Sequence, residues 1–247
     1  YLESHPVYSE LEAVKRFIFL ASLAPKCKAH IVHMSIPEGA EAVERARGEG
    51  LRNLTVETCP QYLALWEEHL YEVGGVAKCD PPVRSREAVD KLWEYVLDST
   101  IDLIASDHSP HSFTKKKPIN GNFWTVSEGV TGVQTMLPAV VTAGQNRGLT
   151  WEKVAELMAS NPAKIYGLYG RKGAIEIGFD ADFVLISPME RWTLKKDELF
   201  YLNQHSPFIG KTLNCKVKQT IVRGTTVYKD GNIYVEPGFG QYCPMDM

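Results

Sequence analysis

The run from residue 101 to residue 110 constrains the fold of this chain more than any other stretch. It reads Ile-Asp-Leu-Ile-Ala-Ser-Asp-His-Ser-Pro, and four of its first five residues are apolar. A segment so short and so apolar is typical of a strand buried on both faces of a sheet. Asp107 follows this strand, which is where α/β enzymes place catalytic side chains. Taken alone, Asp107 fits equally well as a cap for the following turn.

Two earlier runs have the same character. Residues 29–34 form a short apolar segment that carries His30 and His33, and residues 54–60 are rich in β-branched side chains before a proline. Strand alternation places His30 on the opposite face from His33, so we expect His30 to be a hydrogen-bonded structural residue. For His33 taken alone, the same structural role is the alternative interpretation.

Helical patterns lie between these strands. A Ser-x-x-Glu capping box at residues 9–12 predicts a helix that ends before Pro25. Ser35 followed by Pro37 predicts the start of a second helix, and Ser85 predicts the start of a third. Strands and helices thus alternate at the spacing of βα units, which indicates a parallel sheet.

The chain changes character after residue 108. Residues 109–126 form a polar segment longer than most connections, which favours a lid or binding loop over a solvated linker, although both stay open. From residue 173 onward, short strands are expected at 173–178, 181–186, 217–222, 225–228 and 233–235. The pairs Arg223-Gly224 and Asp230-Gly231 fit the turns between them. This part is expected to be antiparallel.

Composition excludes several classes of protein. The net charge of −3 gives no reason to expect nucleic acid or a membrane surface as partner. No apolar run approaches the ~20 residues of a membrane helix. The five cysteines are odd in number and scattered, which favours a reducing compartment, and we expect a cytoplasmic protein. The chain begins at Tyr1 without an initiator Met, so we expect it to continue a longer polypeptide; a trimmed chain would look the same.

His33 and Asp107 are the candidate metal ligands. The carboxyl ends of parallel strands face one site, so these two side chains are expected to lie together. Imidazole and carboxylate suit zinc, manganese, iron or cobalt. His108 and His111, in the following loop, are further candidates for substrate contact. Two ligands are fewer than a catalytic zinc uses, and the sequence contains no HxH or HExxH pair. Either the other ligands precede Tyr1, or the chain is not a competent metalloenzyme.

At this point the sequence resembles a known family, the cyclic amidohydrolases, which hold allantoinase, hydantoinase or dihydropyrimidinase, and dihydroorotase. The resemblance runs from about residue 1 to about residue 236, and within the family the sequence is most similar to allantoinase. Seven motifs carry it, at residues 29–35 (Ala-His-Ile-Val-His-Met-Ser), 57–63 (Glu-Thr-Cys-Pro-Gln-Tyr-Leu), 78–84 (Lys-Cys-Asp-Pro-Pro-Val-Arg), 105–110 (Ala-Ser-Asp-His-Ser-Pro), 161–168 (Asn-Pro-Ala-Lys-Ile-Tyr-Gly-Leu), 172–175 (Lys-Gly-Ala-Ile) and 178–182 (Gly-Phe-Asp-Ala-Asp).

The resemblance implies an α/β fold: the C-terminal part of a TIM-like (β/α)8 barrel, over residues 1–170, plus a small antiparallel β-sandwich segment with the C-terminal tail, over 171–247. It implies a binuclear metal centre, most often zinc, in which His33 is a ligand and Asp107 is both ligand and catalytic base. An HxH pair, a carboxylated lysine and another histidine would come from a region that this chain lacks. The main chain around Cys79 and Asp80 resembles the stretch that contacts the substrate's ring amide.

The implied reaction is metal-assisted hydrolysis of a small cyclic amide, allantoin to allantoate in purine catabolism, by a homo-oligomer. Gln61 and residues 126–132 depart from the allantoinase pattern, and Gln61 is the choice typical of hydantoinases. A hydantoinase or dihydropyrimidinase is therefore the alternative enzyme, and a non-catalytic binding or assembly module is the alternative outside the enzymes. We expect residues 1–247 alone to be inactive, to expose an unpaired sheet edge and to aggregate; a soluble monomer with a cooperative melt would contradict this expectation.

Overall fold

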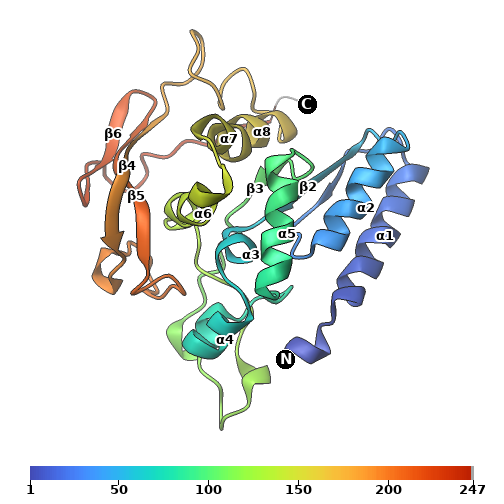
Figure 1. Cartoon of the computed structure of the whole chain (residues 1–247). Helices are drawn as coiled ribbons and strands as arrows, with labels where there is room; N and C mark the ends of the chain where they lie inside the picture. The colour runs from blue at the N-terminus through green and yellow to red at the C-terminus, as the bar shows by residue number, and fades with distance from the viewer. Residues whose placement is uncertain (246–247) are drawn as a thin grey trace.

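The computed structural model describes residues 1–245, which form a parallel sheet with helices packed on it and a separate antiparallel sheet (Figure 1). Strands β1, β2 and β3 make the parallel sheet in that order, and β4 to β7 make the antiparallel one. The helices are α1 (Val7–Leu23), α2 (Pro37–Gly48), α3 (Pro60–Ala64), α4 (Glu67–Val73), α5 (Arg86–Leu97), α6 (Met136–Gly144), α7 (Trp151–Ala155) and α8 (Asn161–Ile165). The strands are β1 (Ala29–Ile31), β2 (Leu54–Thr58), β3 (Leu103–Ile104), β4 (Phe183–Thr193), β5 (Thr212–Val222), β6 (Thr225–Lys229) and β7 (Asn232–Ile233).

The predicted parallel sheet is confirmed, although its strands are shorter than the apolar runs. Ala29 of β1 pairs with Leu54 of β2, and Leu103 of β3 pairs with Glu57. Hydrogen bonding continues past the strand ends, since the Met34 amide donates to the Glu57 carbonyl at 2.8 Å. The three chain segments therefore stay side by side up to the points where His33 and Asp107 occur.

Helix starts test the capping predictions. Ser85 caps α5 as predicted, and its hydroxyl accepts from the Ala88 amide. The prediction of a capping box at residues 9–12 is wrong, because α1 already begins at Val7 after Pro6 and Ser9 lies inside the helix. Ser35 does not cap α2 either: its hydroxyl donates to the Glu10 carboxylate instead.

This difference gives a matched pair of substitutions. Ser85→Ala removes an N-cap and is expected to lower the free energy of unfolding by about 1 kcal/mol. Ser9→Ala removes only an exposed bond to the Pro6 carbonyl, 2.7 Å long, and is expected to cost clearly less. Urea denaturation of the two variants measures the difference, and equal losses would contradict the observed caps.

One apolar core connects the two sheets. The inner face of α5 contributes Val89, Leu92, Trp93 and Val96 to it, all buried. The same core continues into Leu194, Leu199 and Phe208, which lie between β4 and β5, and into Leu213 at the start of β5. Figure 1 shows α6 lying between the antiparallel sheet and the helices of the parallel one. The domain boundary near residue 170 stays a prediction.

The antiparallel part confirms most of its predicted strands and turns. Arg223 and Gly224 have φ values of 50° and 77°, and Asp230 has a φ of 44°, as tight hairpin turns require. The predicted strand at 173–178 is wrong, since both of its end glycines have left-handed φ values, 91° and 100°, and the segment turns. Among the described residues, no helix combines the length and the apolar character that a membrane span needs.

Candidate metal and substrate site

The two predicted metal ligands lie at the same end of the parallel sheet. His33 follows β1 by two residues and Asp107 follows β3 by three, on either side of the end of β2. Both have left-handed backbone, with φ values of 42° and 45°. Such φ values are costly for residues with a Cβ and cluster at functional sites, where the surrounding structure holds them in place. The structure thus places both residues at one end of the parallel sheet, and their binding of one ion stays a prediction.

The surroundings of Asp107 favour a carboxyl that holds its proton more tightly than usual. Burial of one side of the carboxyl raises its pKa, although the residue is open to solvent on the other side. His33 lies close enough to lower that pKa, whereas the charge of Glu57 raises it. Gln61 lowers it by donating from Nε2 to the Asp107 carboxylate over 3.3 Å. The carboxylate is therefore more basic than usual, and His33 acts on it through its charge.

Gln61 was not predicted as a site residue. It is buried in the first turn of α3, a helix that begins at Pro60 directly after β2. The sequence signal for it is the Cys-Pro step at the strand end, because proline at the first helical position turns the chain across the edge of the sheet. The side chain that follows this proline then points at the neighbouring strand end.

His30 has the hydrogen-bonded surroundings that we expected, although it lines the same cavity as His33 and is not on the opposite face. Its Nδ1 lies 2.7 Å from the Thr55 hydroxyl, and its Nε2 lies 3.1 Å from the Glu57 carboxylate. Both partners belong to β2, so the imidazole links the first two strands of the sheet. His30 therefore anchors the buried carboxylate of Glu57, whose charge acts on Asp107.

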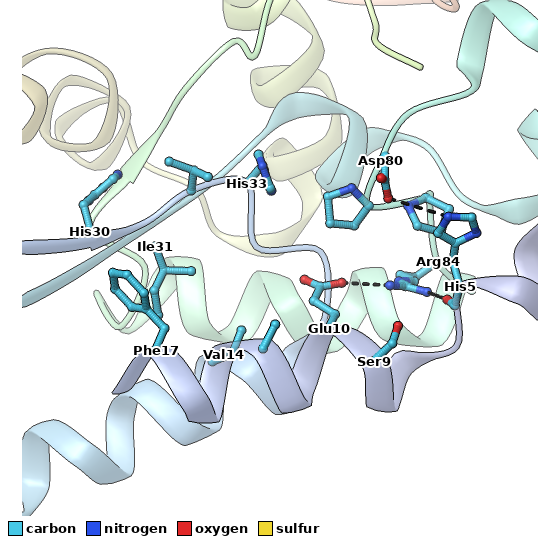
Figure 2. Close-up of a pocket in the computed structure, with 14 residues that line it drawn as sticks. His5, Ser9, Glu10, Val14, Phe17, His30, Ile31, His33, Asp80 and Arg84 are labelled. Carbon is cyan, nitrogen blue, oxygen red and sulfur yellow. Dashed lines mark hydrogen bonds and ion pairs between the residues drawn. The ribbon is translucent and has the colours of Figure 1, made fainter. Parts of the chain in front are cut away.

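A cavity of about 510 Å³ opens beside β1, between α1 and the segment that contains Asp80. Figure 2 shows Phe17 and Glu10 rising from α1 on one side and Arg84 with Asp80 on the other (Figure 2). Of the predicted site residues, His33 and Asp80 line this cavity, while Asp107 and Cys79 are not among its lining residues.

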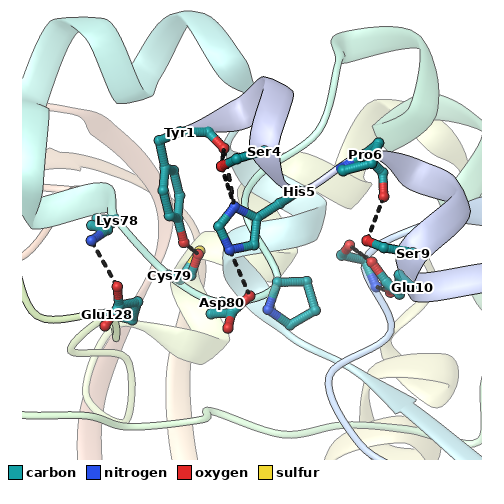
Figure 3. Close-up of polar contacts among 12 residues, drawn as sticks. Tyr1, Ser4, His5, Pro6, Ser9, Glu10, Lys78, Cys79, Asp80 and Glu128 are labelled. Carbon is teal, nitrogen blue, oxygen red and sulfur yellow. Dashed lines mark hydrogen bonds and ion pairs between the residues drawn. The ribbon is translucent and has the colours of Figure 1, made fainter. Parts of the chain in front are cut away.

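Cys79 and Asp80 lie on one segment but in different surroundings. Cys79 is buried, and burial raises the pKa of its thiol to about 12. Its carbonyl accepts a 2.8 Å hydrogen bond from the Tyr1 hydroxyl, while the Asp80 carboxylate faces His5 at 4.0 Å (Figure 3). Asp107 is among the charges that raise the pKa of Cys79. The segment therefore lies near Asp107 on the Cys79 side and shares a cavity with His33 on the Asp80 side.

The loop histidines have other tasks. The Nδ1 of His108 accepts hydrogen bonds from the amides of Gly132 and Val133, so this imidazole ties the loop to the chain before α6. The carbonyl of His111 lies 2.7 Å from the Nε2 of His205. His108 holds the loop through its imidazole, whereas His111 does so through its main-chain carbonyl, and the predicted substrate contacts of both stay predictions.

His33 and Asp107 fit part of a divalent metal site. A neutral imidazole and a partly desolvated, basic carboxylate are the nitrogen and oxygen donors that zinc and related ions bind. Within residues 1–245, no group of three or more His, Cys, Asp and Glu side chains could hold an ion by itself. The chain thus offers two donors of the right chemistry at one end of its parallel sheet.

Comparison with known proteins gives a consistent result. Residues 4–227 match the amidohydrolase family. Allantoinases of Escherichia coli, from strain K12 and from strain E24377A, are 39% identical over 240 residues, which is 97% of this chain and 51% of theirs. The chain spans about half the length of the curated relatives it matches.

Solved structures agree in fold. The L-hydantoinase (dihydropyrimidinase) from Arthrobacter aurescens superposes with a TM-score of 0.91 at 35% identity, over 96% of this chain and 52% of that one. The dihydropyrimidinase from Brevibacillus agri gives 0.87 at 27% identity, over 92% and 50%. The predicted fold class, part of a TIM-like barrel with an antiparallel β segment, is therefore confirmed. On the strength of the matched residues and of this fold, the chain belongs to the amidohydrolase family.

Proposed function

We propose that this chain supplies the β1–β3 side of the catalytic site in a metal-dependent hydrolase that opens a cyclic amide, allantoin to allantoate. One observation carries the proposal: His33 and Asp107 follow the two strands that flank β2, at the carboxyl end of one parallel sheet, with Gln61 bonded to the Asp107 carboxylate. The 39% identity to allantoinases supports the choice of allantoin.

Each residue then has a chemical task. A divalent ion, which we propose to be zinc, would supply Lewis-acid polarisation of the ring carbonyl and of the attacking water. Asp107 accepts the proton that the water loses when its oxygen bonds to the carbonyl carbon. Asp107 then returns this proton to the ring nitrogen as the carbon–nitrogen bond breaks, so that base and acid are one group. In the metal-free chain, burial raises the pKa of Asp107, which makes its carboxylate a stronger base for the first of these steps.

The main chain around Cys79 and Asp80 is proposed to hold the ring amide. The position of this segment is fixed, since the Cys79 carbonyl accepts a hydrogen bond from the Tyr1 hydroxyl and the Cys79 thiol is buried. His33 and Asp80 line one cavity, which supports their assignment to a common site.

A hydantoinase or dihydropyrimidinase is the second candidate. Gln61 favours it, because this residue contacts Asp107 at a position where the resemblance to allantoinase predicts histidine. The 35% identity to the L-hydantoinase points the same way. We further propose that the protein is a cytoplasmic homo-oligomer. We also propose that residues 1–247 alone have little activity, because the described residues offer only two donors of the implied set.

The test uses the protein encoded by the complete gene. Its divalent metal content and its turnover of allantoin and of 5-substituted hydantoins are measured side by side. Bound metal with faster hydrolysis of allantoin supports the first candidate, and faster hydrolysis of hydantoins supports the second. A well-folded protein without metal or turnover would leave a binding or assembly role in place of catalysis.

A further inference from the structure

Two lysines are buried beside the predicted substrate segment. Lys78 has no exposed surface and Lys116 has 2%. Charged side chains are almost never so buried unless they are paired, because their removal from water is costly. Lys116 belongs to the run of three lysines at 115–117, which otherwise has the composition of an exposed charged loop, and its two neighbours are indeed exposed.

Both ammonium groups bind main-chain carbonyls: Lys78 binds carbonyls of the long loop, and Lys116 binds carbonyls just after it. Lys78 donates to the carbonyls of Phe123 and Val126 at 3.2 and 2.7 Å and pairs with the Glu128 carboxylate at 2.7 Å. Figure 3 shows the Lys78–Glu128 contact next to Cys79. Lys78 thus ties the distal part of the loop to the residue that precedes the predicted substrate segment.

Lys116 bonds the residues just after the loop to the same segment. Its Nζ donates to the carbonyls of Ser127 and Gly129, both at 2.7 Å, and to the carbonyl of Lys78 at 3.1 Å. The Gly129 amide donates to the same Lys78 carbonyl at 2.9 Å. Residues 127–129 are therefore bonded directly to the backbone that leads into Cys79.

The same stretch is bonded to the strand end that carries Asp107. The Ser109 amide donates to the Val130 carbonyl at 2.9 Å. Gly129 has a φ of 125°, and a Cβ there would lie 2.2 Å from the Ser109 hydroxyl, so the two segments meet without room for a side chain. Residues 127–130 thus bridge the Cys79 segment and the Asp107 loop.

We infer that Lys78 and Lys116 form a clamp that fixes residues 127–130 between these two segments, and that both are positioning residues for substrate binding. The statement about substrate rests on the proposed function, whereas the clamp itself does not. The loop at 109–126 is then a preformed wall of the site rather than an open linker. Burial of charge is weak evidence for stability but can fix one arrangement of the chain.

The protonation of Lys116 offers a check on its burial. Burial lowers the pKa of Lys116 from 10.5 to about 8; Cys79 and Glu128 act to raise it and Lys78 to lower it. Between those two values the unfolded chain binds more protons, so this residue makes stability rise with pH. Between pH 7.5 and 9.5, the urea midpoint of the wild type is therefore expected to rise relative to the urea midpoint of Lys116→Met. A constant difference would show that Lys116 is not desolvated.

Hydrogen exchange followed by mass spectrometry tests the clamp in the whole chain, with Lys115→Met as the control for the exposed neighbour. Lys116→Met and Lys78→Met are each expected to speed exchange in peptides covering 127–130 at least tenfold, while β5 and the Lys115→Met variant stay within about twofold. Unchanged exchange at 127–130, or an equal rise everywhere, would overturn the clamp.

Two further measurements separate the possible failures. If a variant does not fold, amine-reactive labelling of the wild type replaces it: Lys78 and Lys116 are expected to react at least tenfold more slowly than Lys115, and equal rates would overturn the clamp. In the protein from the complete gene, Lys116→Met is expected to raise KM for the cyclic amide at least tenfold with kcat within threefold. A KM that stays constant overturns the positioning role, and a wild type that hydrolyses no cyclic amide overturns the proposed function while the exchange result stands.

Discussion

Asp107→Asn is expected to lower kcat for hydrolysis of the cyclic amide by about 10²- to 10⁴-fold in the protein from the complete gene. The amide keeps the shape of the side chain and can still accept from Gln61, but it cannot take the proton from water or return it to the ring nitrogen. Steady-state kinetics with allantoin, together with the metal content of each preparation, measure the effect.

The control for this substitution is Asp197→Asn, which makes the same chemical change at an exposed position in the turn before Leu199. It is expected to leave kcat within about twofold. Thermal unfolding of both variants should match the wild type closely, since neither residue is in the apolar core. Turnover of Asp107→Asn within tenfold of the wild type would remove this residue from the proposed mechanism.

Arg84→Met is expected to lower the free energy of unfolding by about 3–5 kcal/mol, because it leaves the largely buried Glu10 carboxylate without its charged partner. Arg84 lies 2.8 Å from the Glu10 carboxylate, and its guanidinium also donates to the Ser35 hydroxyl and to the His5 carbonyl. These contacts join α1, the end of β1 and the segment after Cys79. For a chain of roughly this size, the loss corresponds to a drop in Tm on the order of 10 °C.

Helix α1 offers a matched control for this pair. Glu10→Gln should cost nearly as much as Arg84→Met, and the double variant should cost less than the sum of the two. Glu12, two residues on, forms an exposed pair with Arg16, so Glu12→Gln should cost only about 0.3–0.5 kcal/mol. Urea denaturation of the protein from the complete gene gives all four values. Similar losses for Glu10→Gln and Glu12→Gln would contradict the importance of the buried cluster.

The parts of this fold that follow from local pattern could be predicted from the sequence. Apolar runs ended by proline located the parallel strands, and the parallel direction alone placed His33 and Asp107 at one edge of the sheet. Ser85 was found as a cap because its bond joins residues three apart in the chain. The hairpin turns were found because glycine, at 224 and 231, and aspartate, at 230, tolerate positive φ.

The parts that depend on distant contacts could not be predicted. Ser35 has the pattern of a helix cap, yet its hydroxyl bonds to Glu10, 25 residues away, and accepts from Arg84, 49 residues away. Lys116 has the pattern of a solvated charge, yet it binds a carbonyl 38 residues earlier. A polar side chain pairs with whatever the tertiary fold brings to it, and no local period reports that choice.

Convergence of His33 and Asp107 on one divalent ion is the central claim, and anomalous diffraction at the zinc absorption edge tests it most directly. Crystals of the protein from the complete gene, grown with zinc, are predicted to show an anomalous peak in direct contact with both the His33 imidazole and the Asp107 carboxylate. A peak bound to only one of these side chains, or none at this edge of the sheet in a well-ordered crystal, would contradict the claim.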